Sequence, residues 1–341
     1  MIRRPVRNVV PAARSGDPRE VVPVPDLEIH GRTLNCTEES IAREPVVSAV
    51  DPDGRKMLRL EVRNSQTPIE RMPLSMGTYL VELSAPGHVT VRYPVNIERE
   101  EHWDGVPPGE HRTRPIRLPR QGELGPDDCY VPPGWFACGG DPLQGRSLSA
   151  RRVWVDGHVF KRFPVTNADY AEFVANTRAL PPAWWGGRQP PEDKRTHPVV
   201  GVTIAQARAY AEWRGKRLPT TLEWVAAARG SDNTLMPWGE SCVDKACHCP
   251  RNRPRTTAPV DAHPAGRSGE GVQDLIGNVW EWTERHDALL PDDADYHFVM
   301  GGSFKHRCTF PSQLPRTAVS KHGEYLYLGF RCARDPGVSN A

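Results

Sequence analysis

The chain has 341 residues, of which 35 are Pro and 29 are Gly. This length is enough for two domains, and so much Pro and Gly favours short strands and ordered loops over a helical bundle. The net charge of +2 argues against nucleic acid as a partner, because such binding needs a concentrated basic face. No apolar run approaches the roughly 18–20 residues that span a bilayer, so we expect no membrane partner.

The N-terminal segment 1–20 is rich in Arg but lacks the apolar core of a secretory signal. We therefore expect a flexible arm at 1–20 and a cytoplasmic location. In that compartment the eight Cys residues are thiols rather than a disulfide framework.

Residues 21–118 alternate short apolar stretches with turn signals. The clearest are 77–84 and 89–97, each with apolar side chains on one face, separated by the turn pair Pro86-Gly87. This pattern predicts a hairpin within a small antiparallel, sandwich-like β domain. Pro94 suits an edge strand, because it has no N–H to donate.

Helix starts occur only in the following region. Three Thr residues are each followed three positions later by an acidic or amide residue, which is the capping-box pattern. The pairs are Thr166 with Asp169, Thr203 with Gln206, and Thr220 with Glu223. Gly230 supplies a stop for the third helix. Beyond it we expect long irregular loops with few strands.

The same region carries short phrases that follow one another in a familiar order. They include Phe163-Pro-Val-Thr-Asn, Gly215-Lys-Arg-Leu-Pro-Thr, Gly277-Asn-Val-Trp-Glu-Trp, Gly301-Gly-Ser-Phe and Gly329-Phe-Arg. In this order they resemble the formylglycine-generating enzyme, or sulfatase-modifying factor, family. The resemblance implies an α+β, C-type-lectin-like domain over 119–336, with a tail at 337–341. In that family two helices, a small antiparallel sheet and long loops are held by Trp and structural Ca²⁺.

A narrower resemblance extends further toward the N-terminus. The phrases Arg92-Tyr-Pro-Val, Tyr130-Val-Pro-Pro-Gly-Trp-Phe and Gly139-Gly-Asp-Pro look like the C-terminal region of bacterial serine/threonine kinases that carry this domain. The kinase itself is missing, since the chain has no Gly-rich nucleotide loop, His-Arg-Asp or Asp-Phe-Gly.

The resemblance places the family's chemistry just after Gly301. The family's oxidase binds copper(I) with two Cys residues five and ten positions beyond this Gly, and here those positions hold His306 and Pro311. Cys308 lies between them, and one thiol cannot reproduce a bis-thiolate copper site. An iron-dependent branch uses a His-x3-His pattern, and no two His in this chain are four apart. We therefore expect neither copper nor iron.

A structural calcium site is the metal centre that the resemblance favours. Its ligands would be the Asp274 carboxylate, the backbone carbonyls of Gly277 and Val279, and Glu281. Such closely spaced oxygen donors suit Ca²⁺. The alternative is a metal-free turn held by Asn278 and by Trp packing.

A second group of metal-binding residue types comprises Cys242, Cys247, His248 and Cys249. Without a spaced second half it does not define a zinc site. An ordinary loop, a zinc site and a redox-sensitive pair remain open. The family's other calcium site would fall within 247–257, which is altered here, so we expect it to be lost.

The segment 304–327 lies where the family's substrate groove would be. It is rich in the aromatic and basic residues that dominate binding interfaces. The candidate groove residues are Phe304, Lys305, His306, Arg307, Phe310, Arg316 and Tyr325.

These observations predict a non-catalytic binding or scaffold protein. Its partner would be a protein or peptide in a bacterial signalling or stress-response assembly, such as a separately encoded kinase or protease. The alternative is a formylglycine-generating or other oxidoreductase with a remodelled site, for which His306 and Cys308 are the weak catalytic candidates.

Overall fold

The computed structural model describes part of the chain. The described residues are 22–23, 46–50, 56–61, 73–74, 77–84, 87–97, 107–110, 117–138, 151–231, 234–239, 243, 245–249, 256–284, 295–306 and 314–337. They fall into two compact units, 1–121 with 132–135 and 122–131 with 136–341. The expected arm at 1–20 and residues 338–341 of the expected tail lie outside the described residues.

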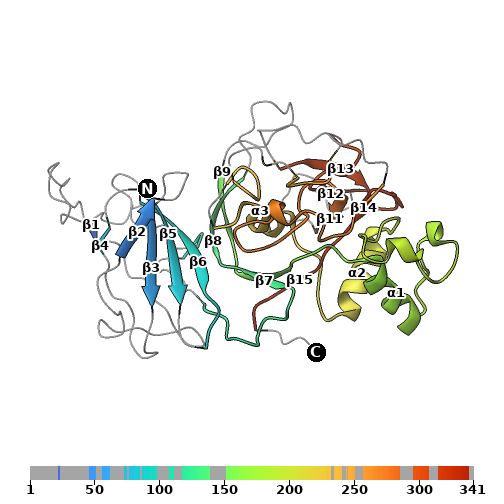
Figure 1. The fold of residues 1–341 in the computed structure, drawn as a ribbon, viewed down its shortest axis with the longest axis horizontal. Coiled ribbons are helices and arrows are strands. Elements are labelled where there is room, and N and C mark those ends of the chain that lie inside the picture. Colours follow the sequence, from blue (N-terminus) through green and yellow to red (C-terminus); the bar gives the residue numbers. More distant parts are fainter. Residues whose placement is uncertain are drawn as a thin grey trace. The chain divides into compact units, whose positions relative to one another are not determined.

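The first unit contains a four-stranded sheet in the order β2-β3-β5-β6 (Figure 1). Its strands are β2 (Val46–Val50), β3 (Lys56–Glu61), β5 (Gly77–Ser84) and β6 (Val91–Ile97). Two short strands, β1 (Val22–Pro23) and β4 (Pro73–Leu74), pair with each other.

The predicted hairpin is confirmed, because β5 and β6 are antiparallel with Leu80 opposite Pro94. Pro94 lies in the edge strand of the sheet, as expected. The sheet differs from the expected antiparallel arrangement at one pair, since β3 and β5 run parallel. The chain between Glu61 and Gly77 is long enough for the crossover that parallel neighbours require.

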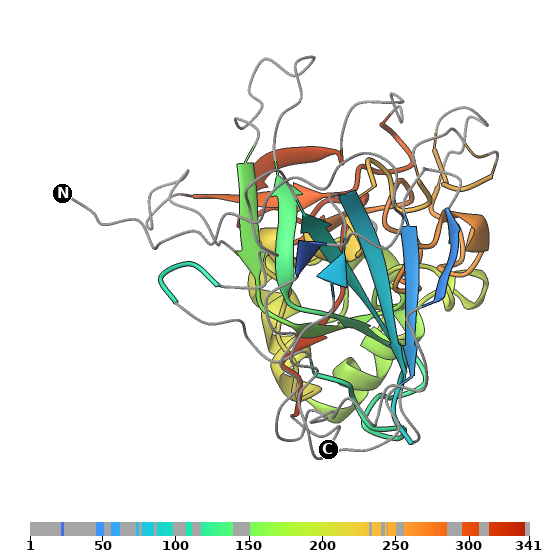
Figure 2. The ribbon, with the colours of Figure 1, turned by 90° about the vertical axis from the view of Figure 1, so that its left-hand side faces the viewer.

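The second unit is built from short strands. They are β7 (Asp128–Val131), β8 (Gly134–Cys138), β9 (Arg151–Val155), β10 (His158–Lys161), β11 (Trp280–Trp282), β12 (Tyr296–Met300), β13 (Arg316–Ser320), β14 (Leu328–Gly329) and β15 (Ala333–Arg334). They form the sheets β15-β10-β7 and β13-β12-β11-β14, and β8 pairs with β9 (Figure 2).

All three predicted α-helices are present, and each begins at its capping box. They are α1 (Asn167–Asn176), α2 (Ile204–Trp213) and α3 (Thr221–Arg229). Gly230 ends α3 with a φ of +61°. The other described helical turns are the short 3₁₀ segments η2 (Ala183–Trp185), η3 (Glu192–Lys194) and η5 (Pro264–Gly266). No described helix is both long enough and apolar enough to cross a bilayer.

Two buried clusters hold the second unit together. One joins α1 and α2 to β11 and β14 through aromatic contacts, such as Tyr170 stacked on Tyr210 with ring centroids 5.7 Å apart. The other surrounds Trp224 of α3, which is fully buried. Aromatic pairs of this kind contribute about 0.5–1.5 kcal/mol each beyond area burial. The helices therefore anchor the strands and loops that carry the candidate site.

Candidate functional site

The loop before β11 has an unusual backbone. Asp274 and Asn278 have φ values of +55° and +51°, which residues other than Gly seldom adopt. Gly277 between them has φ +82°, and a Cβ there would collide with the carbonyl oxygen of His248. The loop therefore requires Gly at 277 and tolerates Asp and Asn at its two strained positions.

The Asn278 side chain holds this loop in place. It accepts a hydrogen bond from Ala258 N (2.9 Å) and donates to Ala258 O (3.0 Å). It also donates to Asp274 Oδ2 at 2.7 Å. The turn held by Asn278, which the sequence suggested as one alternative, is thus present.

A fully buried ion pair lies directly beneath the loop. Arg331 donates to Glu281 Oε1 at 2.5 Å and to Oε2 at 2.7 Å, and both side chains have no exposed surface. Trp224 Nε1 adds a third hydrogen bond to Glu281 Oε2, at 2.8 Å. The remaining Arg331 donors bind four backbone carbonyls, those of residues 161, 162, 273 and 274. Every charge in this cluster therefore has a partner.

Sequence reasoning did not foresee the roles of Arg331 and Trp224. In the sequence, Arg331 stands out only as part of the phrase Gly329-Phe-Arg. Its partner Glu281 lies 50 residues away in the chain, and spacing alone gives no sign of such a pairing.

The expected calcium ligands fit an oxygen-bound cation. Asp274 is 4% exposed, and burial raises the pKa of its carboxyl well above the ordinary value, with the charge of Glu281 adding to the rise. Within the described part of the chain, Asp274 Oδ1 and the carbonyl oxygens of Gly277 and Val279 accept no hydrogen bond. A buried carboxylate beside unused carbonyls is a donor set that suits Ca²⁺. Glu281 differs from the other three, because Arg331 already balances its charge.

His306 is held by two neighbours. Trp280 Nε1 donates to His306 Nδ1 at 3.1 Å, and Ser303 Oγ lies 2.8 Å from the same nitrogen. Since Nδ1 accepts, the neutral ring carries its proton on Nε2. Partial burial, together with the charge of Lys305, lowers the pKa of His306. Neutral His306 is therefore the form that this environment favours.

Aromatic and basic side chains surround His306. The Tyr327 ring is 6.1 Å from His306 and 5.6 Å from Tyr325. The ammonium of Lys305 lies 4.7 Å from the Tyr327 ring, which is cation–π geometry. Leu326 is 55% exposed beside these residues. We call Lys305, His306, Tyr325, Leu326 and Tyr327 the aromatic face.

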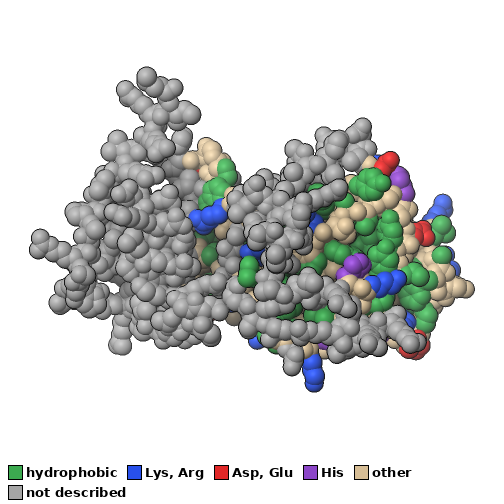
Figure 3. Space-filling view, turned by 90° about the horizontal axis from the view of Figure 1, so that it is seen from above, with side chains coloured by type: hydrophobic (Ala, Val, Ile, Leu, Met, Phe, Trp, Pro, Cys, Tyr) green, Lys and Arg blue, Asp and Glu red, His purple; other side chains and the backbone are tan. Residues whose placement is uncertain are grey.

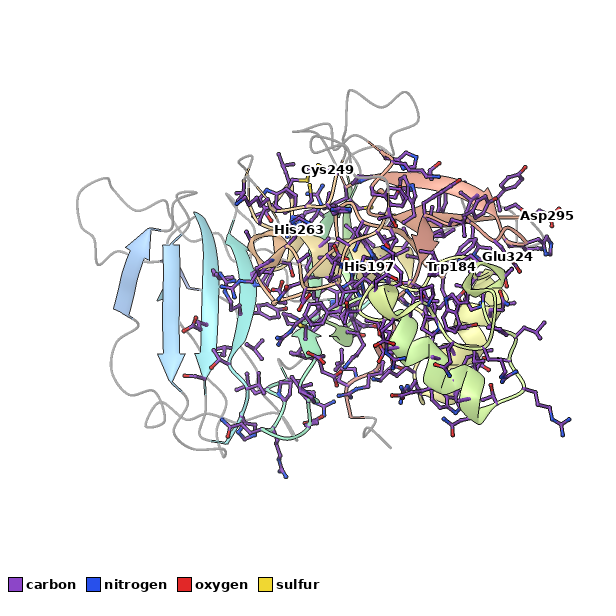
Figure 4. All side chains as sticks on the ribbon, turned by 45° about the vertical axis from the view of Figure 1, so that its right-hand side comes forward. Trp184, His197, Cys249, His263, Asp295 and Glu324 are labelled. Atoms are coloured by element: carbon purple, nitrogen blue, oxygen red, sulfur yellow. The ribbon has the colours of Figure 1, made fainter. Side chains whose placement is uncertain are left out.

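Figure 3 shows hydrophobic side chains gathered on the described surface, with His and Lys or Arg side chains among them. Trp184 and Leu326 both approach Gly201, within 3.1 and 3.4 Å of where its Cβ would be. Trp184 and Glu324 are labelled in Figure 4.

The other predicted groove residues have different surroundings. Phe304 is buried, and its N–H binds Asn278 O at 2.9 Å, so it supports the surface rather than lining it. The Arg316 guanidinium lies 4.6 Å from the Phe298 ring on the neighbouring strand. Arg307, Cys308 and Phe310 lie outside the described residues.

The cysteine-rich loop does not assemble a metal site among the residues described. Cys249 is buried and Cys247 is half-buried. His248 is committed to a hydrogen bond with Thr256 O at 2.9 Å, and its ring lies 5.6 Å from that of His263. Cys249 and His263 are labelled in Figure 4. No group of three potential metal ligands occurs in the described part of the chain, and Cys242 lies outside it.

Comparisons with known proteins agree with this architecture. The model of the sulfatase-modifying factor enzyme 1-like domain matches residues 116–336. The formylglycine-generating enzyme of Mus musculus is 31% identical, over 60% of this chain and 74% of its own. The inactive C-alpha-formylglycine-generating enzyme 2 of Bos taurus is also 31% identical, over 61% of this chain and 87% of its own. The structure of PvdO from Pseudomonas aeruginosa is 19% identical, covers 61% of this chain and 94% of its own, and superposes with a TM-score of 0.52.

The fold is therefore α+β and C-type-lectin-like, as the sequence predicted. The chain belongs to the family of the sulfatase-modifying factor enzyme 1-like domain. That family includes both a formylglycine-generating enzyme and a relative described as inactive. The likeness to kinase-attached domains stays a prediction.

Proposed function

We propose that this chain is a non-catalytic binding module that recognises a protein or peptide through the aromatic face. One observation carries the proposal. His306, which by the resemblance takes the position of the family's first copper-binding Cys, has its Nδ1 occupied by Trp280 and Ser303. The second position holds Pro311, which cannot bind a metal through its side chain.

The chemistry argues against the oxidoreductase alternative. Copper(I) is selected by soft thiolate ligands, and only Cys308 remains in this segment. A base for Cys308 would need a lone pair on a His306 nitrogen. Nδ1 uses its lone pair on Trp280, and Nε2 carries the proton in the neutral ring. His306 therefore serves better as a fixed hydrogen-bond donor on a binding surface.

The aromatic face has the composition of an interface. Tyr side chains contribute large contact area at a small entropy cost, and exposed Leu326 offers an apolar anchor. Lys305 adds one positive charge over Tyr327. A peptide with an apolar side chain next to a carboxylate complements these groups. On the resemblance alone, we assign the partner to a cytoplasmic bacterial signalling or stress-response assembly, such as one with a separately encoded kinase or protease.

We further propose that one Ca²⁺ supports this surface from the loop before β11. Asp274 Oδ1 and the carbonyls of Gly277 and Val279 would hold it, with Glu281 sharing its carboxylate between the ion and Arg331. The ion would neutralise the buried Asp274 and fix the backbone that continues into Trp280. Its part is structural, since these groups lie in a buried loop.

A matched pair of leucine variants tests the binding proposal. Leu326→Asp places a charge on the aromatic face, whereas Leu180→Asp changes another leucine, 73% exposed, outside it. Quantitative affinity capture from the native host should recover a partner with wild type and Leu180→Asp. Recovery should fall about tenfold or more with Leu326→Asp, as for an interface anchor. Equal recovery by all three proteins would refute the role of the face.

A further inference from the structure

A second candidate site lies away from the aromatic face. It is a cavity of about 440 Å³ between the end of β10, the start of α1, the end of α2 and Cys332. None of its lining residues belongs to the aromatic face. The volume lies in the range that small-molecule sites occupy, so the cavity can hold a compact organic molecule.

Most of the charged groups around this cavity are already paired. Lys161 Nζ lies 3.1 Å from Asp128 Oδ1, and Arg214 binds Glu172 at 2.6 Å. Asp169 accepts from Thr166 N at 3.0 Å and from its hydroxyl at 2.6 Å in the cap of α1. These groups therefore form the walls of the cavity and leave little charge for a ligand.

Two opposite charges in the lining are unsatisfied. Lys216 and Asp127 are both half-buried, and in the described part of the chain neither side chain forms a hydrogen bond or an ion pair, although Asp128 attracts the Lys216 ammonium from a distance. Burial lowers the pKa of Lys216, and nearby Lys161 lowers it further. A carboxylate beside the Lys216 ammonium would offset that cost, and the Asp127 carboxylate can accept hydrogen bonds from an ammonium.

The rest of the lining combines apolar side chains with Thr166. Phe163, Val165, Tyr210 and Val260 contribute to it, and the last three are less than 10% exposed. A ligand with an apolar body would therefore displace water from the cavity at a gain in free energy.

We infer that this cavity binds a small zwitterion, namely an α-amino acid with an apolar side chain. Lys216 receives the carboxylate, Asp127 receives the ammonium, and the apolar wall receives the side chain. The two opposite and unpaired charges favour a zwitterion over a simple acid or amine, because either of these would leave one charge unmatched.

Calorimetric titration of the full chain with L-phenylalanine tests this inference. Phenethylamine, which lacks the carboxylate, and 3-phenylpropionate, which lacks the ammonium, are the matched probes. We expect phenylalanine to bind with a Kd of about 1 mM or below. Each of the other probes should bind about tenfold more weakly, because one charged group is left unpaired.

Two variants assign the roles of the charges. Lys216→Met should bring the phenylalanine affinity down to that of phenethylamine, and Asp127→Asn should bring it down to that of 3-phenylpropionate. Lys321→Met, which removes a lysine on the β13 side of the molecule, should leave all affinities unchanged. The inference is overturned if phenylalanine does not bind, if the three probes bind equally, or if Lys216→Met and Asp127→Asn bind like wild type. Partner capture by the aromatic face is measured separately, so either proposal can fail alone.

Discussion

At the scale of single residues, Arg331 and Glu281 form a buried ion pair in the second unit. Both side chains have no exposed surface, and Trp224 completes the hydrogen bonds of the carboxylate. Breaking such a pair leaves an uncompensated buried charge, whereas an exposed pair contributes little. Removing the charge of a buried acid should therefore cost much more stability than removing the charge of an exposed one.

Glu281→Gln should destabilise the second unit by about 3–5 kcal/mol, because the Arg331 charge would remain buried without its partner. Its control is Glu172→Gln, which removes the exposed partner of Arg214 and should cost less than about 1 kcal/mol. Urea unfolding in the presence of a calcium chelator measures both effects. Equal losses in the two variants would contradict the assigned role of the buried pair.

At the scale of elements, three capping boxes set the starts of the helices. In α2, the Thr203 hydroxyl accepts from Gln206 N at 3.3 Å, and Gln206 Oε1 accepts from Thr203 N at 2.7 Å. Each bond satisfies a donor that the first helical turn would otherwise leave unpaired. Because the cap depends only on residues within one turn, the free energy of unfolding that is lost on its removal can be predicted.

Thr203→Ala should lower the free energy of unfolding by about 1 kcal/mol, because Gln206 N–H loses its acceptor. Thr203→Ser keeps the hydroxyl and should cost clearly less. Thermal unfolding followed by circular dichroism compares the two variants. If Ser and Ala destabilise the chain equally, the side-chain bond is not what stabilises this helix start.

The capping boxes also explain which parts of the fold could be predicted. Each box depends on residues three apart, so the sequence alone located α1, α2 and α3. The β5–β6 hairpin was equally local. The parallel pairing of β3 with β5 was not, because it joins strands that are separated by the whole segment 62–76, and no local pattern specifies the direction of that pairing.

In the candidate site, too, local features could be predicted from the sequence and long-range contacts could not. The phrases near Asp274 and Gly301 indicated where a site would lie, and Asn278 was identified as a residue that holds the turn. The Trp280–His306 bond joins residues 26 apart, and the Glu281–Arg331 pair joins residues 50 apart. Such contacts depend on how the sheet β13-β12-β11-β14 brings loops together, and no local pattern encodes them.

At the scale of the whole molecule, the chain combines a small sheet unit with a lectin-like unit. The lectin-like unit retains the loop in which Asp274, Gly277 and Val279 present oxygen atoms without hydrogen bonds. Metal binding to the folded state alone stabilises it by mass action. Calcium binding should therefore raise the free energy of unfolding of this unit.

Addition of Ca²⁺ at about 100 times its Kd should stabilise the wild type by about 2.7 kcal/mol, and Mg²⁺ should not. Asp274→Asn keeps a residue that tolerates positive φ but removes the charge, so its response to Ca²⁺ should shrink. Without calcium the variant should be at least as stable as wild type, because it removes a buried carboxylate. The proposed site would be contradicted if Ca²⁺ did not change the stability of the wild type, or if it stabilised Asp274→Asn as much as the wild type.

The most direct test of the central claim is oxygen consumption by the purified chain with a cysteine-containing peptide and one equivalent of copper(I). We predict a rate no higher than that of peptide and copper alone, and the same rate for His306→Ala/Cys308→Ser. Catalytic oxygen consumption that disappears in this double variant would contradict the account, because it would show that His306 and Cys308 form a working redox centre.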